Sequence, residues 1–318
     1  MRVGLFVPEE PEMHVQALSA FAGGLRRLQV DHFIAKLSAG WRPCDVAVTF
    51  GIEKAATPRG LLVGEIATAQ TAYGGEHLVI ERGFIHREQY FMAGWGGLNG
   101  RADFCNDSMP SDRWDELRLQ IDPWRTRGNH IVLCGQVPWD ASVQHTDHSV
   151  WCRQTAMDIR SFTDRPIIFR PHPLVPNGAI DMSGTDVIFT QNQSLAEDLR
   201  EAWCAVTFNS NSAVEAALSG IPVFAFDRGS MALPVANRSL EQIEAPTAPD
   251  RQAWLNNLAY AQWTLEEMSL GLPWLHLSKK TNIQKPTWFR RYTYRFCPRF
   301  LRDIAADKQT VMAYPSEP

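Results

Sequence analysis

The feature that most constrains the fold is a pattern that occurs three times within residues 129–230. Each time, a short apolar run ends directly in a polar, turn-forming segment. All three runs are rich in β-branched and aromatic residues, which predicts buried strands. They occupy residues 131–134, 167–169 and 205–208. A helix is expected at 212–218 and a further strand at 222–226. Strands that alternate with helices predict an α/β fold with a parallel sheet and crossover helices.

Ligands of such sheets bind in the crevice beyond the carboxyl ends of the strands. The three polar segments begin at that edge, so we expect their side chains to form one ligand site. The candidates for ligand contact are Gln136, Asp140, Ser142, Arg170, His172, Ser210, Asn211, Ser212 and Glu215.

The second and third segments carry groups suited to a phosphate or a sugar. In Arg170-Pro171-His172-Pro173 the prolines stiffen the backbone around an imidazole that could hydrogen-bond a ligand or lend it positive charge. The alternative is a structural histidine in a turn. Residues 210–212 open a helix, whose free N–H groups favour an anion, although such residues also form ordinary caps. Glu215 either completes a capping box or contacts a ribose diol.

Composition narrows the class of protein. The 318 residues are enough for two domains, and 45% hydrophobic with 21% charged residues is typical of globular proteins. Acidic residues follow the short apolar N-terminal run, so we expect no signal peptide and a cytoplasmic protein. No apolar run approaches the ~18 residues of a membrane span. Six scattered cysteines without a CxxC pair predict reduced thiols, and no Asp-x-Asp motif is present, so neither a metal nor a cofactor is expected.

The N-terminal third predicts a second α/β domain, over residues 1–125, followed by a linker near 120–128. The domain with the three polar segments is expected at 129–262, and a C-terminal segment at 263–318. Strands are expected at 3–7, 32–34, 45–49, 61–66 and 78–80. Helices are expected at 13–28, 151–162, 194–202 and 252–269.

Two further stretches are unusual. Residues 68–105 are dense in glycine, which predicts structured loops, either functional or a plain surface excursion, without a P-loop or dinucleotide fingerprint. Residues 279–302 hold eight basic and no acidic residues, interleaved with aromatics. Because the net charge is −4 and this segment contributes +8, the rest of the chain carries −12. The segment could contact nucleic acid, anchor at an anionic inner-membrane surface, or pack back on the N-terminal domain.

The three segments together resemble those of bacterial capsule-polysaccharide Kdo transferases. Residues 135–142 resemble that family's GQV-x-x-DAS stretch, and residues 169–178 its strand followed by K/R-P-H-P and a glycine. Residues 209–220 are similar to its Ser-rich turn, Glu-Ala helix and small-residue ending. The resemblance covers about 130–230, with departures at Trp139, at the Asn-Ser-Asn-Ser turn, and at residues 227–230, where Asp-Arg-Gly-Ser replaces an aromatic, glycine-rich ending.

The resemblance implies a GT-B-like glycosyltransferase: two Rossmann-like, doubly wound domains facing a cleft. In that family the donor is a CMP-sugar, and a CMP- or UDP-sugar is expected here. His172 would touch the nucleotide. Ser210 and Ser212 would hold its phosphate with Glu215 nearby, and residues 136–142 would lie at the cleft.

The mechanism expected from the sequence needs no metal. A helix N-terminus and Arg170 would stabilise the leaving phosphate. A base from the N-terminal domain would activate the acceptor hydroxyl, and its candidates are Glu9, Glu10, His14 and Glu81. The acceptor would be a saccharide, a glycolipid or a hydroxylated nucleic-acid base. A DNA-modifying glycosyltransferase, a nucleotide-sugar epimerase or hydrolase, and a non-catalytic nucleotide-sugar binding module are the alternatives.

Overall fold

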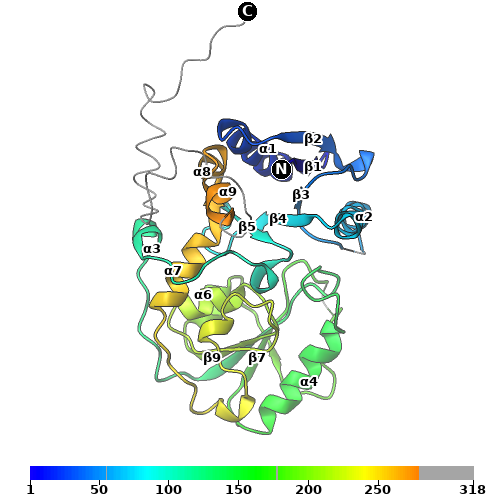
Figure 1. Cartoon of the computed structure of the whole chain (residues 1–318). Helices are drawn as coiled ribbons and strands as arrows, with labels where there is room; N and C mark the ends of the chain where they lie inside the picture. The colour runs from blue at the N-terminus through cyan, green and yellow to red at the C-terminus, as the bar shows by residue number, and fades with distance from the viewer. Residues whose placement is uncertain (55, 177, 279–318) are drawn as a thin grey trace, which may run out of the picture.

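Two α/β units lie one above the other in the computed structural model, which describes residues 1–54, 56–176 and 178–278 (Figure 1). The upper unit contains the N-terminus, and the lower one contains α4, α6, β7 and β9. The basic segment 279–302 lies outside the described residues. Within the described part, no helix combines the length and hydropathy that crossing a bilayer requires.

The first sheet has six strands in the order β11-β5-β4-β3-β1-β2. Its strands are β1 (Val3–Val7), β2 (His32–Lys36), β3 (Val46–Phe50), β4 (Glu76–Arg82), β5 (Tyr90–Trp95) and β11 (Gln262–Thr264). β1 to β4 run parallel, with Leu5 opposite both Ile34 and Val48, whereas β5 and β11 are antiparallel additions at one edge. Helices α1 (Glu12–Arg27) and α2 (Pro58–Tyr73) supply the crossovers. This is a parallel α/β sheet with a mixed edge.

The second sheet is parallel throughout, in the order β10-β9-β6-β7-β8. Its strands are β6 (His130–Cys134), β7 (Ile167–Arg170), β8 (Ile188–Phe189), β9 (Ala202–Thr207) and β10 (Val223–Ala225). The connecting helices are α4 (His148–Arg160), α5 (Leu195–Leu199) and α6 (Ser212–Leu218). Because β6 is central and its neighbours β7 and β9 continue in opposite directions, the strand order reverses beside it, which is where such sheets bind ligands.

The chain then returns to the first unit. Helix α7 (Gln252–Tyr260) rises from the lower unit in Figure 1, and β11 adds to the first sheet beside β5. Helices α8 (Leu265–Ser269) and α9 (Leu272–Leu277) follow, and α8 packs on α1. The contact is close at Gly24, where a Cβ would stand 2.2 Å from the Met268 carbonyl oxygen. The short helix α3 (Asp112–Leu117) packs on α7.

One hydrophobic core belongs to both units. It joins Phe84, Ile85 and Met92 from the first sheet's side to residues of the second unit such as Val132 and Ala213. Burial of apolar surface stabilises a fold by about 25 cal/mol per Å². A core shared in this way therefore couples the two units energetically instead of leaving them joined by a linker alone.

Three expectations about local structure were wrong. Residues 61–66 belong to α2, because Thr57 caps a helix that begins with Pro58, and this start signal outweighs the β-branched run. Residues 252–269 form α7, β11 and α8 instead of one helix, because 262–264 pair with β5, a partner distant in sequence. Residues 68–105 are not mainly loop: the strand expected at 78–80 is confirmed as part of β4, and β5, which was not expected, also lies in this stretch.

Candidate functional site

The loops that follow the carboxyl ends of β3 and β4 in the first unit meet those that follow β6 and β9 in the second at the junction of the two units. Three contacts across the junction show this. The Asn211 amide donates to the Phe84 carbonyl at 3.1 Å, and Gln144 donates to the Glu53 carbonyl at 3.2 Å. Lys54 lies 3.7 Å from the Asp140 carboxylate. The site described below is the edge of the second sheet together with this opposing wall.

Gln136 and Asn209 join the loops after β6 and β9. Gln136 Nε2 donates to Asn209 Oδ1 at 2.7 Å, and the Asn209 N–H donates to Gln136 Oε1 at 3.0 Å. Both side chains are buried, and Asn209 also donates to the Ser142 carbonyl at 2.9 Å. Buried amides paired in this way fix loop positions. Gln136 thus braces the edge of the sheet from within.

His148 supports the same loop from behind. Its Nε2 accepts the Gln136 N–H at 2.7 Å, so the proton of the neutral ring is on Nδ1. The ring stacks on Trp151 at a centroid distance of 5.4 Å and is 1% exposed. Burial lowers its pKa from 6.5 to about 4, against a smaller opposing effect of Asp147. A neutral His148 is therefore part of the folded site at neutral pH.

Asp140 and Ser142 form a tight turn that faces the first unit. Asp140 Oδ1 accepts both the Ser142 N–H at 3.0 Å and the Ser142 hydroxyl at 2.8 Å, while Oδ2 lies near Lys54. Both residues are partly exposed. Their carboxylate and hydroxyl oxygens therefore lie at the junction with local partners already in place.

Arg170 ends β7 and is held by the protein. Its guanidinium lies 2.6 Å from Asp198, which is 2% exposed, and donates to the Asn192 and Gln193 carbonyls. A paired guanidinium in such a fork orders the residues around it. Arg170 thus ties the loop after β8 to the edge of the sheet.

His172 stands two residues further on and is half-buried. Its Nδ1 accepts the Leu174 N–H at 3.2 Å, which leaves Nε2 as the nitrogen that carries the proton in the neutral ring. Burial lowers its pKa; Asp140 opposes this and Arg87 of the first unit adds to it. A neutral imidazole there is a hydrogen-bond donor.

The turn before α6 carries three polar residues in sequence. Ser210 Oγ accepts the Ser212 N–H at 3.2 Å, and Asn211 contacts Phe84 across the junction and Glu215 Oε1 at 3.5 Å. Asn211 makes no side-chain cap, so Glu215 is not the partner in a capping box. Asn211 Oδ1 is buried and has no hydrogen-bond partner among the described residues, whereas the buried Ser212 Oγ interacts with the Cys134 thiol.

Glu81 stands on the opposite wall, at the end of β4. Its Oε1 accepts the Arg82 N–H at 2.9 Å, and its Oε2 would lie 3.3 Å from a Cβ on Gly51. Burial raises the pKa of Glu81, and so does Asp140 of the second unit, while the Arg82 N–H, Arg87 and Arg82 lower it. Glu81 is therefore a carboxyl with a raised pKa that is within electrostatic reach of the donor-side turn.

The three other base candidates differ from Glu81. Glu9 is exposed and pairs with Lys36 at 3.3 Å, and Glu10 is exposed. His14 is buried against Phe50, with ring centroids 3.7 Å apart, and its Nδ1 has no hydrogen-bond partner among the described residues. Burial, with Arg59 and Arg82, lowers the pKa of His14 to about 4. Glu81 differs from them in being a partly buried carboxyl whose pKa is raised, chiefly by burial.

Asp227, which follows β10, is a member of the site that the sequence analysis did not select. Its Oδ1 accepts Asn209 Nδ2 at 2.7 Å and the Gly229 N–H at 2.8 Å, and both its oxygens accept Arg101 of the first unit at 2.6 Å. Burial alone would raise the pKa of Asp227, but these donors hold it well below its usual range. The departure of residues 227–230 from the family's sequence pattern was the one feature of the sequence that could have drawn attention to Asp227. No sequence feature pointed to the bracing roles of Asn209 and His148.

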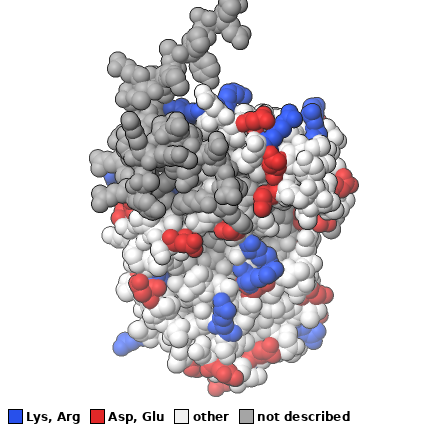
Figure 2. All heavy atoms as spheres, viewed as in Figure 1, with Lys and Arg blue, Asp and Glu red and all other residues white. Residues whose placement is uncertain are grey.

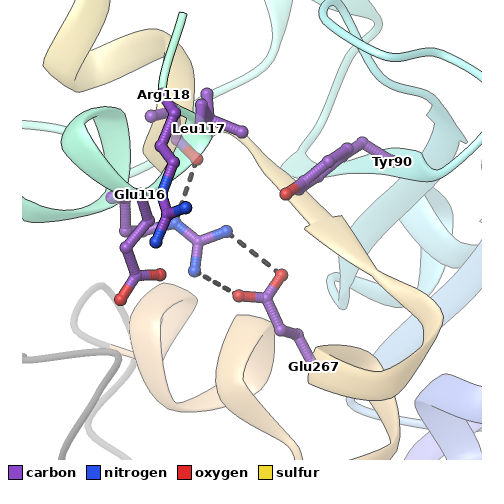
Figure 3. Close-up of a pocket in the computed structure, with 7 residues that line it drawn as sticks. Tyr90, Glu116, Leu117, Arg118 and Glu267 are labelled. Carbon is purple, nitrogen blue, oxygen red and sulfur yellow. Dashed lines mark hydrogen bonds and ion pairs between the residues drawn. The ribbon is translucent and has the colours of Figure 1, made fainter.

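A cavity of about 460 Å³ lies elsewhere and involves none of the predicted site residues. Figure 3 shows Glu267 pointing into it, where the carboxylate accepts hydrogen bonds from Arg113 at 2.6 and 3.2 Å. Arg113 also lies over the Trp263 ring at 4.2 Å and donates to the Ala259 carbonyl, so it fastens α3 to α7 and β11. We assign this buried pair a structural role.

The surface charges, the groups that could bind a metal, and the cysteines were compared with the site. On the face shown in Figure 2, acidic and basic side chains are interspersed among the described residues, with basic ones at the level of the junction. Within the ranges that the structure describes, no group of three or more His, Cys, Asp or Glu side chains is arranged to hold a metal ion. The five cysteines of these ranges are free thiols.

No family model and no curated protein matches the chain. Among solved structures, the chain is similar to the β-Kdo 2,4 transferase of Thermosulfurimonas dismutans KpsC, with 14% identity over 82% of this chain and 90% of that chain and a TM-score of 0.52. It is also similar to the β-Kdo 2,7 transferase of the same KpsC, with 15% identity over 86% of this chain and 99% of that chain and a TM-score of 0.47. A UDP-GlcNAc 2-epimerase of Methanocaldococcus jannaschii shares 11% identity with the chain over 71% of this chain and 83% of that chain, with a TM-score of 0.28. The first of these confirms the expected GT-B-like fold and the resemblance to Kdo transferases at the level of the fold.

Proposed function

We propose that the protein is a glycosyltransferase that binds a nucleotide-activated sugar on the carboxyl edge of the second sheet and transfers the sugar to an acceptor hydroxyl. One observation carries the proposal: the loop after β3 approaches Glu81 at Gly51, where a Cβ would stand 3.3 Å from the carboxylate, and places Lys54 3.7 Å from Asp140 of the second unit. A carboxylate base thus faces the expected donor groups across the junction. The motif resemblance and the shared fold with a Kdo transferase support this reading.

The donor is proposed to be a CMP- or UDP-sugar. A neutral His172 suits a hydrogen bond from Nε2 to the nucleotide, because its pKa is lowered and Nδ1 is already occupied. The Ser210 hydroxyl is proposed to donate to the phosphate; the Ser212 hydroxyl, the other candidate, is buried against Cys134 in this structure. No metal is needed in this scheme, since hydrogen-bond donors aimed at the leaving phosphate stabilise the charge that develops there.

The chemical step is a displacement at the anomeric carbon. The acceptor oxygen forms the new bond to that carbon while its proton passes to the Glu81 carboxylate. The bond from the carbon to the phosphate oxygen breaks, and its electron pair goes to the nucleotide. General base catalysis is most effective when the pKa of the base lies near the operating pH, so the raised pKa of Glu81 suits this role. We propose a saccharide or a glycolipid as the acceptor.

Donor consumption by the full-length chain tests the proposal. CMP- and UDP-sugars are incubated with and without a panel of saccharide acceptors, and nucleotide release is measured. Glu81→Gln is expected to reduce acceptor-dependent release at least 100-fold, because a positioned base contributes roughly 10²–10⁴-fold. Glu65→Gln, a change at an exposed residue of α2, serves as the matched control and is expected to retain full activity.

Three outcomes would contradict the proposal. Release that needs no acceptor would indicate a hydrolase, and conversion of the sugar without release would indicate an epimerase. Binding without any turnover would indicate a binding module. Full activity in Glu81→Gln would remove Glu81 as the base.

A further inference from the structure

We propose that Arg101 and Asp227 are a positioning pair that sets the spacing between the two walls of the site. The pair joins two loops to which the proposed function assigns no role, the loop after β5 in the first unit and the Asp-Arg-Gly-Ser turn after β10 in the second. The inference rests on the proposed function only for its effect on turnover. Its effect on the junction itself is independent of what the protein catalyses.

The contact is bidentate and partly buried. Arg101 Nη1 lies 2.6 Å from Asp227 Oδ1, and Nη2 lies 2.6 Å from Oδ2. The side chains are 24% and 11% exposed. A planar guanidinium bound to both oxygens of a carboxylate fixes direction as well as distance, which a single ammonium contact does not. The pair can therefore define how the first unit sits on the second.

The backbone at the same place permits this approach. The Gly100 N–H donates to the Gly229 carbonyl at 3.0 Å, across the junction. A Cβ on Gly100 would stand 2.5 Å from the Arg228 carbonyl oxygen, which is closer than such atoms approach. The absence of a side chain at Gly100 therefore lets the two backbones approach closely beside the Arg101–Asp227 contact.

Asp227 also connects the first unit to the loops expected to bind the donor. The same carboxylate accepts Asn209, and Asn209 in turn holds both Gln136 and the Ser142 carbonyl. The chain of contacts leads from the first unit through Asp227 and Asn209 to the loops after β6 and β9. Neither Arg101 nor Asp227 needs to touch the substrate for the spacing of the walls to depend on them.

His145 completes the contact from the loop after β6. Its Nε2 lies 3.1 Å from Arg101 Nη2 and 3.4 Å from Asp227 Oδ2. The loop that carries His145 also carries Asp140 and Gln144, both of which contact the first unit. One loop of the second unit therefore contacts the first unit at three residues, and the Arg101–Asp227 pair lies at one end of these contacts.

The polar pair is chemically distinct from the shared hydrophobic core. The core separates only when apolar surface is exposed to water, whereas the groups of the partly exposed Arg101–Asp227 pair can bind water in place of each other when the contact opens. We therefore expect the units to part first where Arg101 meets Asp227, while the core keeps them attached. This predicts a reversible adjustment of the cleft at the Arg101 side.

Amide exchange at Gly100 measures this parting directly, because its N–H is bonded across the junction. We expect Arg101→Met to raise the exchange rate of Gly100 at least tenfold, and Arg101→Lys to raise it less. Arg160→Met is the matched control. Arg160 pairs with Asp186 at 2.9 Å within the second unit, so its removal is expected to leave Gly100 exchange unchanged.

Kinetics distinguish positioning from a general loss of stability. With the donor that the wild type uses, Arg101→Met is expected to lower kcat about tenfold while the donor KM changes less than twofold, and Arg101→Lys is expected to restore part of kcat. Asp227→Asn keeps the shape of the pair and gives a second test if Arg101→Met fails to fold. Unchanged Gly100 exchange in both variants would overturn the inference. If the wild type transfers no sugar, the proposed function fails, and the exchange rates alone decide the role of the pair.

Discussion

Replacing His148 with Gln should make the free energy of unfolding depend less strongly on pH. His148 is neutral in the folded protein and accepts the Gln136 N–H, and its pKa is about 4 instead of 6.5. Because the folded-state pKa is lowered, the unfolded chain binds a proton between these values that the folded chain does not. The stability that neutral His148 contributes is therefore complete above about pH 6.5 and is lost as the pH falls towards 4.

The size of the loss follows from the two pKa values. One unit corresponds to about 1.4 kcal/mol, so between pH 7.5 and pH 4.5 the wild type should lose about 2.5 kcal/mol through this group. At pH 7.5, His148→Gln should itself be destabilised by roughly 1–3 kcal/mol, because the Gln136 N–H and the Trp151 stacking lose their partner. At pH 4.5 this deficit should nearly vanish or reverse.

Urea denaturation followed by tryptophan fluorescence at several pH values measures the deficit. Phe169→Leu provides a matched control, because Phe169 is a fully buried residue of the same unit without a titratable group. Its deficit should be the same at pH 7.5 and pH 4.5. The reasoning is refuted if the deficit of His148→Gln also stays constant over this range.

Three further predictions concern the opposite wall and the cavity. The pKa of Glu81 is raised in the folded state, so ionisation of Glu81 should lower the stability of the wild type as the pH rises above about 4.5. The Tm of Glu81→Gln relative to that of the wild type should therefore increase with pH. A Tm difference that stays constant with pH would contradict this. Gly51→Ala and Gly74→Ala should each lower the free energy of unfolding by about 1 kcal/mol, since both glycines have positive φ. Only Gly51→Ala should also reduce sugar transfer, because only a Cβ at residue 51 would contact Glu81. Arg113→Met should lose about 3–5 kcal/mol in urea denaturation by removing the guanidinium that neutralises the buried Glu267 carboxylate, and the double variant with Glu267→Leu should recover part of the loss, since it also removes the capping box with Thr264.

The sequence predicted the architecture of the second unit well for physical reasons. Strands at 131–134 and 167–169 were continuous apolar runs bounded by turn residues, and these are typical of fully buried parallel strands. Their loops could be assigned to one edge because parallel strands share their direction. Local pattern was sufficient for these strands, whereas β8 was not expected, and the helix expected at 194–202 ends at Leu199 because β9 begins at Ala202.

Features that depend on distant partners could not be predicted. β11 is only three residues long and exists because Trp263 and its neighbours pair with β5, more than 160 residues earlier. The pairing of Gln136 with Asn209, and that of Arg101 with Asp227, likewise joins residues that no local pattern connects. The roles of Arg170 and Gln136 in bracing loops follow from buried partners that only the fold brings together.

Nucleotide titration of the full-length protein tests the central claim most directly. CMP, UDP and GDP are titrated into the wild type and into His172→Ala. We predict that CMP or UDP binds and that His172→Ala weakens its affinity about tenfold, which corresponds to the loss of one hydrogen bond of about 1.4 kcal/mol. The absence of binding by every nucleotide, or equal affinity in the two proteins, would contradict a nucleotide-sugar site at the edge of the second sheet.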